Sequence, residues 1–324
     1  MTEVMQTPQL VTVFGGAGFL GRHVVRALAK RGYLVRVACR RPDLAGHLQP
    51  LGGVGQIHAV QANLRVRWSV DRAVEGADKV VNLVAILFES GRQSFDAVHD
   101  FGARAVAEVA RSAGAGLTHV SAIGADAHSE SDYARTKALG EQAVLETVPE
   151  AVILRQSIMF GPEDSFFNRF ANMARFSPAL PLIGGGMTKY QPVFVGDVAE
   201  AVARSVDGRV PGGRTYELGG PQQVTFRECM ELMLETIGRK RLLVPVPWWL
   251  ASIQASILGW LPNPILTPDQ VKLLRADNVV SEAAESEGRT LSGLGITPTA
   301  LSAILPSYLW RYRPAGQFTR STEA

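Results

Sequence analysis

The chain has 324 residues, of which 46% are hydrophobic and 19% are charged, and its net charge is +3. This composition is typical of a globular protein, and the length suits one extended domain or a large and a small one. No block of like charges appears, which argues against nucleic acid as a partner. Two cysteines, Cys39 and Cys229, exclude a disulfide framework and indicate a reducing compartment. The first residues lack the character of a signal or transit peptide, so a cytoplasmic-side protein is expected.

A glycine-rich turn follows the first apolar run of the chain. Residues 11–14 predict a strand, and the apolar periodicity over residues 20–31 predicts a helix that Gly32 ends. Glycines at this spacing let a chain reverse, approach a pyrophosphate closely and pack a helix on a strand. Unpaired N–H groups at the start of the helix would then face the phosphates. The expected phosphate-binding residues are Gly15, Gly18, Phe19, Leu20 and Gly21.

Strands and helices alternate as far as residue 155. Further strands are expected at residues 33–39, 56–60, 79–85, 117–121 and 151–155, and helices at residues 68–76, 95–113 and 133–146. Repeated β-α-β units with apolar strands predict a Rossmann-type, doubly wound parallel α/β sheet that is covered on both faces. We expect residues 1–155 to form a nucleotide-binding domain.

The pattern loosens after residue 156, where turn signals become frequent. We expect residues 156–324 to form a smaller C-terminal α/β lobe that is partly interleaved with the first domain. Helices are predicted over residues 163–175, from an Asp197 cap, and from a Thr225 cap through Ile237.

The end of the second strand indicates which nucleotide is bound. Proteins that choose NAD usually place Asp or Glu about 20 residues past the glycines, where it holds the ribose 2′-hydroxyl. Here the strand ends with Cys39, Arg40 and Arg41, and no acid follows directly. Two guanidinium groups can pair with a 2′-phosphate, so NADP(H) is the expected cofactor. The alternative is a pair of solvated surface arginines.

Tyr133 and Lys137 lie one helical turn apart, on one face of a predicted helix. A free tyrosine titrates near pH 10, and it exchanges a proton at neutral pH only if a nearby cation stabilises the phenolate. Ser121, at the end of the preceding strand, is placed to bond a substrate oxygen. The three residues are catalytic candidates if the protein is an enzyme. The alternative is a chance pair on an exposed helix.

These features resemble the extended and atypical short-chain dehydrogenases. The resemblance rests on GGAGFLG at 15–21, YARTK at 133–137, QSIMFGP at 156–162, VFVGDVAEAV at 193–202 and YELGG at 216–220. The motifs occur in the order of the family, over about residues 10–240. Phe14, CRRP at 39–42, NLVAIL at 82–87 and PVPWWLA at 245–251 resemble the branch that contains the NADPH-binding accessory subunit of respiratory complex I.

The resemblance implies where each end of the nucleotide lies. Asn63 and Leu64 would border the adenine, although many members of the family carry Asp where this chain has Asn63. The residues that would border the nicotinamide end are Leu83, Val84, Ala85, Ile86, Gln156, Ser157 and Ile158. In the complex I branch the nucleotide is regarded as structural. Ser121, Tyr133 and Lys137 would then hold a ribose without transferring a hydride.

The stretch of residues 242–268 contains no charged residue. Prolines restrict its helix to residues 248–261, about 21 Å of helix against roughly 30 Å of hydrocarbon, so it cannot span a membrane. Three tryptophans, Trp248, Trp249 and Trp260, resemble interfacial anchors. The small residues that form a stripe suited to close helix contact are Ser252, Ala255, Ser256 and Gly259. The alternative is an ordinary buried helix of the smaller lobe.

Together these features predict an NADPH-binding accessory subunit of respiratory complex I, placed peripherally on the cytoplasmic or matrix side of the inner membrane. It would stabilise the assembly near the membrane and the quinone site, with other complex I subunits as partners and membrane contact through residues 242–268. The alternative is a soluble NADP-dependent reductase or epimerase that acts on a nucleotide sugar or a small carbonyl compound. Neither nucleic acid nor a metal is expected.

Overall fold

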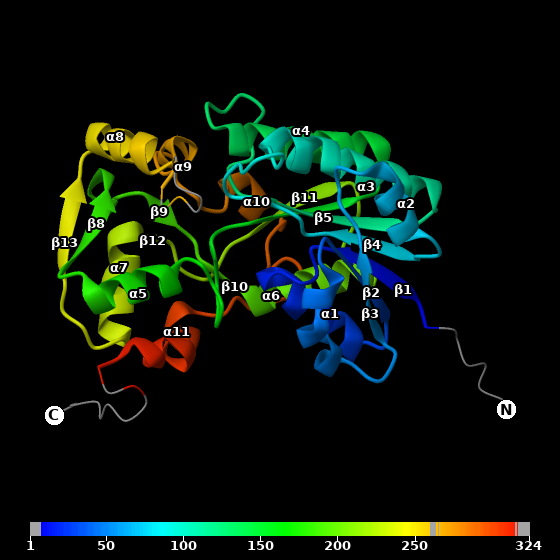
Figure 1. The fold of residues 1–324 in the computed structure, drawn as a ribbon, viewed down its shortest axis with the longest axis horizontal. Coiled ribbons are helices and arrows are strands. Elements are labelled where there is room, and N and C mark those ends of the chain that lie inside the picture. Colours follow the sequence, from blue (N-terminus) through cyan, green and yellow to red (C-terminus); the bar gives the residue numbers. More distant parts are fainter. Residues whose placement is uncertain (1–7, 260–263, 265, 315, 317–324) are drawn as a thin grey trace. The chain divides into compact units, whose positions relative to one another are not determined.

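The computed structural model describes residues 8–259, 264, 266–314 and 316, and Figure 1 shows the chain as a ribbon. The chain divides into two compact units. The first comprises Met1–Arg155 and Val198–Tyr216, and the second comprises Gln156–Asp197 and Glu217–Ala324.

A seven-stranded sheet forms the centre of the first unit. Its strands are β1 (Leu10–Phe14), β2 (Leu34–Cys39), β3 (Ile57–Gln61), β4 (Lys79–Asn82), β5 (Gly116–Ala122), β6 (Val152–Gln156) and β11 (Arg214–Leu218). They lie in the order β11-β6-β5-β4-β1-β2-β3. Because β1 pairs in parallel with both β2 and β4, the strand order reverses between β1 and β4. In open α/β sheets a ligand binds at the carboxyl ends of the strands beside such a reversal.

Helices cover both faces of this sheet. They are α1 (Phe19–Lys30), α2 (Arg67–Val74), α3 (Phe101–Ser112), α4 (Asp132–Thr147) and α6 (Val195–Val206). Figure 1 shows α2, α3 and α4 on one face and α1 and α6 on the other. Val70, Val106 and Val144, one from each helix of the first group, share a buried cluster with the sheet. Arg31, which follows α1, pairs with Glu200 of α6 at 2.8 Å. The predicted doubly wound Rossmann-type sheet is confirmed.

The second unit is a smaller α/β assembly. Its strands are β7 (Met159–Phe160), β8 (Ala179–Ile183), β9 (Lys189–Tyr190), β10 (Val193–Phe194), β12 (Val224–Thr225) and β13 (Leu242–Val246), which pair as β7 with β10, β9 with β12 and β8 with β13. Its helices are α5 (Phe167–Phe176), α7 (Phe226–Thr236), α8 (Trp248–Leu258), α9 (Pro268–Leu273), α10 (Glu282–Ser286) and α11 (Leu301–Leu309). Phe160, Phe167, Met230 and Leu305 lie at the centre of its main core.

The fourth strand is shorter than the sequence predicts. It ends at Asn82, not at residue 85, because the Asn82 side chain accepts a hydrogen bond from the Val84 N–H. Residues 83–86 therefore form a loop at the carboxyl end of β4. The next helix also differs from the prediction, since it begins with a π turn (Asp96–Asp100) that precedes α3.

Two helix starts in the second half of the chain also differ from the prediction. Asp197 is not a cap, since it lies in the first turn of α6 and accepts hydrogen bonds from the backbone N–H and hydroxyl of Thr299. The helix expected from residue 163 begins only at Phe167. Thr225, in contrast, caps α7 as predicted and forms a capping box with Glu228.

The close approach of α1 to the turn after β1 generates a stability prediction. A Cβ atom on Gly21 would lie 2.3 Å from the carbonyl oxygen of Gly15, which belongs to rigid backbone. We expect Gly21→Ala to lower the free energy of unfolding of the nucleotide-free protein by about 3 kcal/mol. A Cβ atom on Gly18 would meet only that same oxygen, at 3.3 Å. Gly18→Ala should therefore lower the free energy of unfolding by only about 1 kcal/mol or less. Denaturant titration of the two variants and the wild type measures both losses. Equal losses in the two variants would contradict this packing argument.

Candidate functional site

The turn between β1 and α1 has the backbone geometry of a phosphate cradle. Gly15 adopts a φ of +79°, which favours glycine, and its N–H donates to the Ala38 carbonyl of β2 at 3.1 Å. Gly18 occupies the N-cap position of α1, and no side chain bonds to the helix end there. The first N–H groups of α1 are thus left for an anion. A dinucleotide pyrophosphate fits this turn, with Gly15, Gly18, Phe19, Leu20 and Gly21 as the residues that would hold it.

The two arginines after β2 differ in how they are held. Arg41 forms an exposed ion pair with Asp43 at 2.7 Å. Arg40 instead donates to the side-chain oxygen of Gln93, a neutral group, on the segment that follows β4. The Arg40 charge is therefore the one that a 2′-phosphate can approach without displacing a carboxylate.

Asn63 and Leu64 follow β3 and have different surroundings. The Asn63 side chain is half-buried and accepts a hydrogen bond from the Arg65 N–H at 3.2 Å, which stabilises the local turn. Leu64 is buried in the main core of the first unit and lies against Gly102 of α3. Of the two, Asn63 is the one with polar groups to offer an adenine.

The loop of residues 83–86 lies against the glycine turn. Its first N–H, on Leu83, donates to the Phe14 carbonyl at 3.0 Å. A Cβ atom on Gly15 would lie 3.2 Å from Cγ2 of Val84. The loop and the glycine turn thus meet at the carboxyl ends of β4 and β1, where the strand order reverses.

Ser121, Tyr133 and Lys137 come from β5 and α4. Ser121 is fully buried, and its hydroxyl has no hydrogen-bond partner within the described part of the chain. Such an orphaned hydroxyl is suited to a ligand oxygen. Lys137 is buried as well, and its Nζ donates to the Val120 carbonyl at 3.0 Å. Burial lowers the pKa of Lys137 to about 8. The lysine is therefore still mainly charged at neutral pH.

Three buried polar residues beside this group were missed by sequence reasoning: Asn82, His99 and His119. His119 Nδ1 lies 3.2 Å from the amide nitrogen of Asn82. Burial, together with the charge of Lys137, holds the pKa of His119 far below its usual value, so its ring is neutral. A histidine in an apolar run is typical of a core position, and the sequence offers no other signal for these residues.

Gln156, Ser157 and Ile158 belong to the second unit. Gln156 is the last residue of β6, and its side-chain oxygen is buried with no partner among the residues that the structure describes. The Ser157 hydroxyl lies 2.7 Å from the side-chain oxygen of Asn278, and Ile158 packs against the core of the second unit. The Gln156 oxygen is thus left able to accept a hydrogen bond from a ligand.

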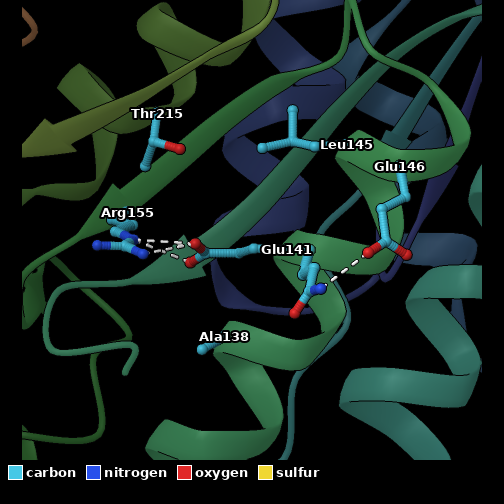
Figure 2. A pocket seen from close by; sticks show the side chains of 7 residues that line it. Ala138, Glu141, Leu145, Glu146, Arg155 and Thr215 are labelled. Atoms are coloured by element: carbon cyan, nitrogen blue, oxygen red, sulfur yellow. Dashed lines mark hydrogen bonds and ion pairs between the residues drawn. The ribbon is translucent and has the colours of Figure 1, made fainter. Parts of the chain in front are cut away.

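A shallow hollow lies on another part of α4, where Figure 2 shows the side chains that line it. The Glu141 carboxylate lines it and forms a bidentate pair with Arg155 at 2.7–3.1 Å. This charge pair is already satisfied internally, and none of the predicted site residues lines the hollow. The hollow therefore does not mark the nucleotide site.

Helix α8 has one buried and one exposed face. Ala251 and Ala255 are fully buried against Val271 of α9, whereas Trp249, Ile253 and Ile257 are 65%, 51% and 69% exposed. The three exposed residues, spaced four apart, form an apolar stripe, which we call the α8 stripe. Among the described residues, no helix is long and apolar enough to cross a membrane.

The stripe of small residues on α8, and one of the predicted tryptophan anchors, differ from the prediction. Ala255 packs inside the second unit, whereas Ser256 is exposed and Ser252 is half-buried, so the small residues do not form one continuous free stripe. The Ser252 and Ser256 hydroxyls bond to carbonyls one turn earlier. Trp248, a predicted interfacial anchor, is half-buried and packs within the second unit. It lies against Gly184, and the Arg275 guanidinium lies 5.6 Å from the centre of the Trp248 ring. Trp260 and the predicted helix end at residue 261 lie outside the described residues.

The buried Lys137 generates a prediction about pH. Its pKa falls from 10.5 in the unfolded chain to about 8, so between these values the unfolded state binds a proton that the folded state lacks. The Lys137 contribution to the free energy of unfolding therefore rises with pH across this window, by about 3 kcal/mol in total.

Denaturant titration at several pH values tests this. We expect Lys137→Met to be more stable than the wild type at pH 7 and to lose most of this advantage by pH 10. Lys30→Met, at an exposed helix end, is the control. A difference between Lys137→Met and wild type that does not change with pH would contradict this account.

Comparisons with known proteins agree with this geometry. The family model of the NAD dependent epimerase/dehydratase family matches residues 11–219. The chain is 35% identical to the mitochondrial NADH dehydrogenase [ubiquinone] 1 alpha subcomplex subunit 9 of Arabidopsis thaliana, over 97% of this chain and 80% of that protein. It is 33% identical to the mitochondrial NADH-ubiquinone oxidoreductase 40 kDa subunit of Neurospora crassa, over 93% of this chain and 79% of that protein.

A solved structure shares the fold. The dTDP-glucose 4,6-dehydratase DesIV from Streptomyces venezuelae, with NAD bound, matches with a TM-score of 0.70 and 21% identity, over 94% of this chain and 96% of that chain. The resemblance based on the motifs is thus confirmed at the level of the family. This chain belongs to the NAD dependent epimerase/dehydratase family.

Proposed function

We propose that this protein is an NADPH-binding accessory subunit of respiratory complex I in which the nucleotide is structural. The observation that carries the proposal is the identity of 33–35% to complex I subunits over 93–97% of the chain. A match of this length includes the second unit, which lies largely beyond the residues that the general family model covers. The likeness therefore extends past the shared nucleotide-binding fold.

The preference for NADPH is supported by the end of β2. Arg40 and Arg41 follow the strand, and neither they nor Cys39 offers a carboxylate to a ribose 2′-hydroxyl. The orphaned Ser121 hydroxyl and the uncapped start of α1 are further groups that a dinucleotide would satisfy. When bound, NADPH would supply a hydride donor. The residues of this chain that face it would hold the phosphates and the riboses.

A nucleotide that binds only the folded state stabilises that state by mass action. The glycine turn joins β1, β2 and α1, so a ligand held there stabilises the centre of the first unit. We therefore propose that the nucleotide is structural, because its binding stabilises the fold of the first unit.

Nucleotide choice can be tested by calorimetric titration. We expect NADPH to bind about one to two decades more tightly than NADH, because a charge-assisted contact to phosphate contributes roughly 1.5–3 kcal/mol. Arg40→Ala should remove most of this preference. Arg41→Ala is the matched control and should remove less of it, because Asp43 already pairs with Arg41. Equal affinity for the two nucleotides in the wild type would refute the NADPH assignment.

The α8 stripe supports a peripheral position in the assembly. Three large apolar side chains on one helix face are costly to leave in water, and such patches usually mark an interaction site. The stripe lies within the uncharged stretch of residues 242–268. We propose that it contacts a membrane-proximal surface of complex I, near the quinone site, on the cytoplasmic or matrix side of the inner membrane.

Substitution of the stripe tests this position. We expect Trp249→Asp with Ile253→Asp to abolish co-migration of the chain with complex I on native gels of solubilised membranes. The nucleotide content of the purified chain should remain unchanged, because both side chains are more than half exposed and support little of the fold. Trp68→Asp alters a tryptophan of similar exposure, 64%, on α2 and should leave association intact.

Two outcomes would count against this proposal. Continued association of the folded double variant would show that the stripe is not the contact. The second candidate is a soluble NADP-dependent reductase or epimerase. It is favoured by the presence of Tyr133 and Lys137 one turn apart on α4, with the Tyr133 ring packed on His99, which bonds to the Ile86 N–H. Oxidation of NADPH by carbonyl compounds that is lost in Tyr133→Phe, with binding retained, would support that candidate instead.

A further inference from the structure

His99 lies at an unusual point of the first unit. It belongs to the π turn that precedes α3, and it is only 2% exposed. Turns of this kind inside helices occur often at functional sites. Gly140 of α4 lets the two helices meet here, because a Cβ atom at this position would lie 2.1 Å from the His99 carbonyl oxygen. The surroundings of the imidazole are therefore closely packed.

Both ring nitrogens of His99 have partners. Nε2 lies 3.1 Å from the Ile86 N–H and accepts its hydrogen bond. Nδ1 lies 3.1 Å from the hydroxyl of Thr136, which donates its own proton to the Asp132 carbonyl at 2.7 Å. The Thr136 oxygen must therefore accept from His99, so the neutral tautomer carries its proton on Nδ1. The imidazole bridges α4 and the loop of residues 83–86.

The ring itself is also fixed. It stacks on Phe95 with centroids 5.4 Å apart and meets the Tyr133 ring edge-on at 5.2 Å. Burial and the nearby charge of Lys137 lower the pKa of His99 to about 3. The imidazole thus remains neutral, and Nε2 remains an acceptor, throughout the physiological pH range.

The loop that His99 holds faces one half of the ligand crevice. The sheet order places β2 and β3 on one side of β1, and β4 and β5 on the other. Arg40 marks the β2 side as the place of the 2′-phosphate and adenosine. A dinucleotide that crosses the reversal in strand order then brings its nicotinamide half to the β4 side. Residues 83–86 follow β4 directly, with Tyr133 packed beside the same histidine.

We infer that His99 is a positioning residue for the nicotinamide half of the nucleotide, which it serves by fixing the loop of residues 83–86 through the Ile86 N–H. The inference rests on the proposed NADPH binding. Asn82 and Phe14 hold the start of this loop, and His99 holds its end. Without the histidine, the nicotinamide half would have to order the loop as it binds.

Half-ligands test this role by calorimetry. We expect His99→Leu to weaken NADPH binding about three- to tenfold, the effect of one lost hydrogen bond. The affinity for adenosine 2′,5′-bisphosphate, which lacks the nicotinamide half, should stay within about twofold of wild type. His99→Gln offers an acceptor and a donor on one amide and should recover most of the NADPH affinity. Thr118→Val removes a buried hydrogen bond to Ser205 and is the control for a general loss of stability.

Other results of these titrations would overturn either the role of His99 or the proposed NADPH binding. If His99→Leu weakens both ligands equally, or if Thr118→Val reproduces its ligand profile, the role is purely structural and the inference is wrong. Unchanged NADPH affinity in His99→Leu would overturn it as well. A wild-type protein that binds neither ligand would instead overturn the proposed NADPH function, and the inference with it.

Discussion

The contact between the start of α1 and the turn after β1 is the constraint on which the nucleotide site depends. Gly21 and Gly15 approach so closely that a single methyl group on Gly21 would lie 2.3 Å from a backbone oxygen. This approach fixes the uncapped end of α1 at the carboxyl end of β1. The loop after β4 then packs against Gly15, and His99 holds the far end of that loop beside Tyr133. A series of backbone and side-chain contacts thus links the proposed phosphate end of the site to its proposed nicotinamide end.

The two units contribute different properties to the proposed function. The first supplies the glycine turn, the arginines after β2 and the buried polar group around Lys137. The second supplies the α8 stripe, whose helix is anchored by Ala251 and Ala255 against α9. Because the residues proposed to bind the nucleotide phosphates and the residues of the α8 stripe lie in different units, substitutions can test nucleotide binding and association separately. Loss of association with nucleotide binding retained would favour the structural subunit that we propose.

The sequence predicts the sheet and the glycine turn well, because apolar β-branched runs and glycine spacing are local signals. Local patterns failed where a distant contact decides the structure. The prediction of the fourth strand failed for a different, local reason: residues 83–85 read as strand, yet the Asn82 side chain accepts a hydrogen bond from the Val84 N–H and the strand ends at Asn82. His99 was missed because its role depends on a π turn and on Ile86 and Thr136, which lie in other segments. Helix α8 carries no charged residue on any face, so only its packing on α9 reveals which face stays exposed.

The central claim is that this chain works as a nucleotide-loaded subunit of complex I. Isolation of complex I from native membranes through an affinity tag on this chain, followed by mass spectrometry of the nucleotide released on denaturation, tests it most directly. The account predicts that complex I co-purifies and that NADP(H) is released in proportion to this chain, with little NAD(H). A chain recovered free of complex I, or a complex-bound chain without nucleotide, would contradict it.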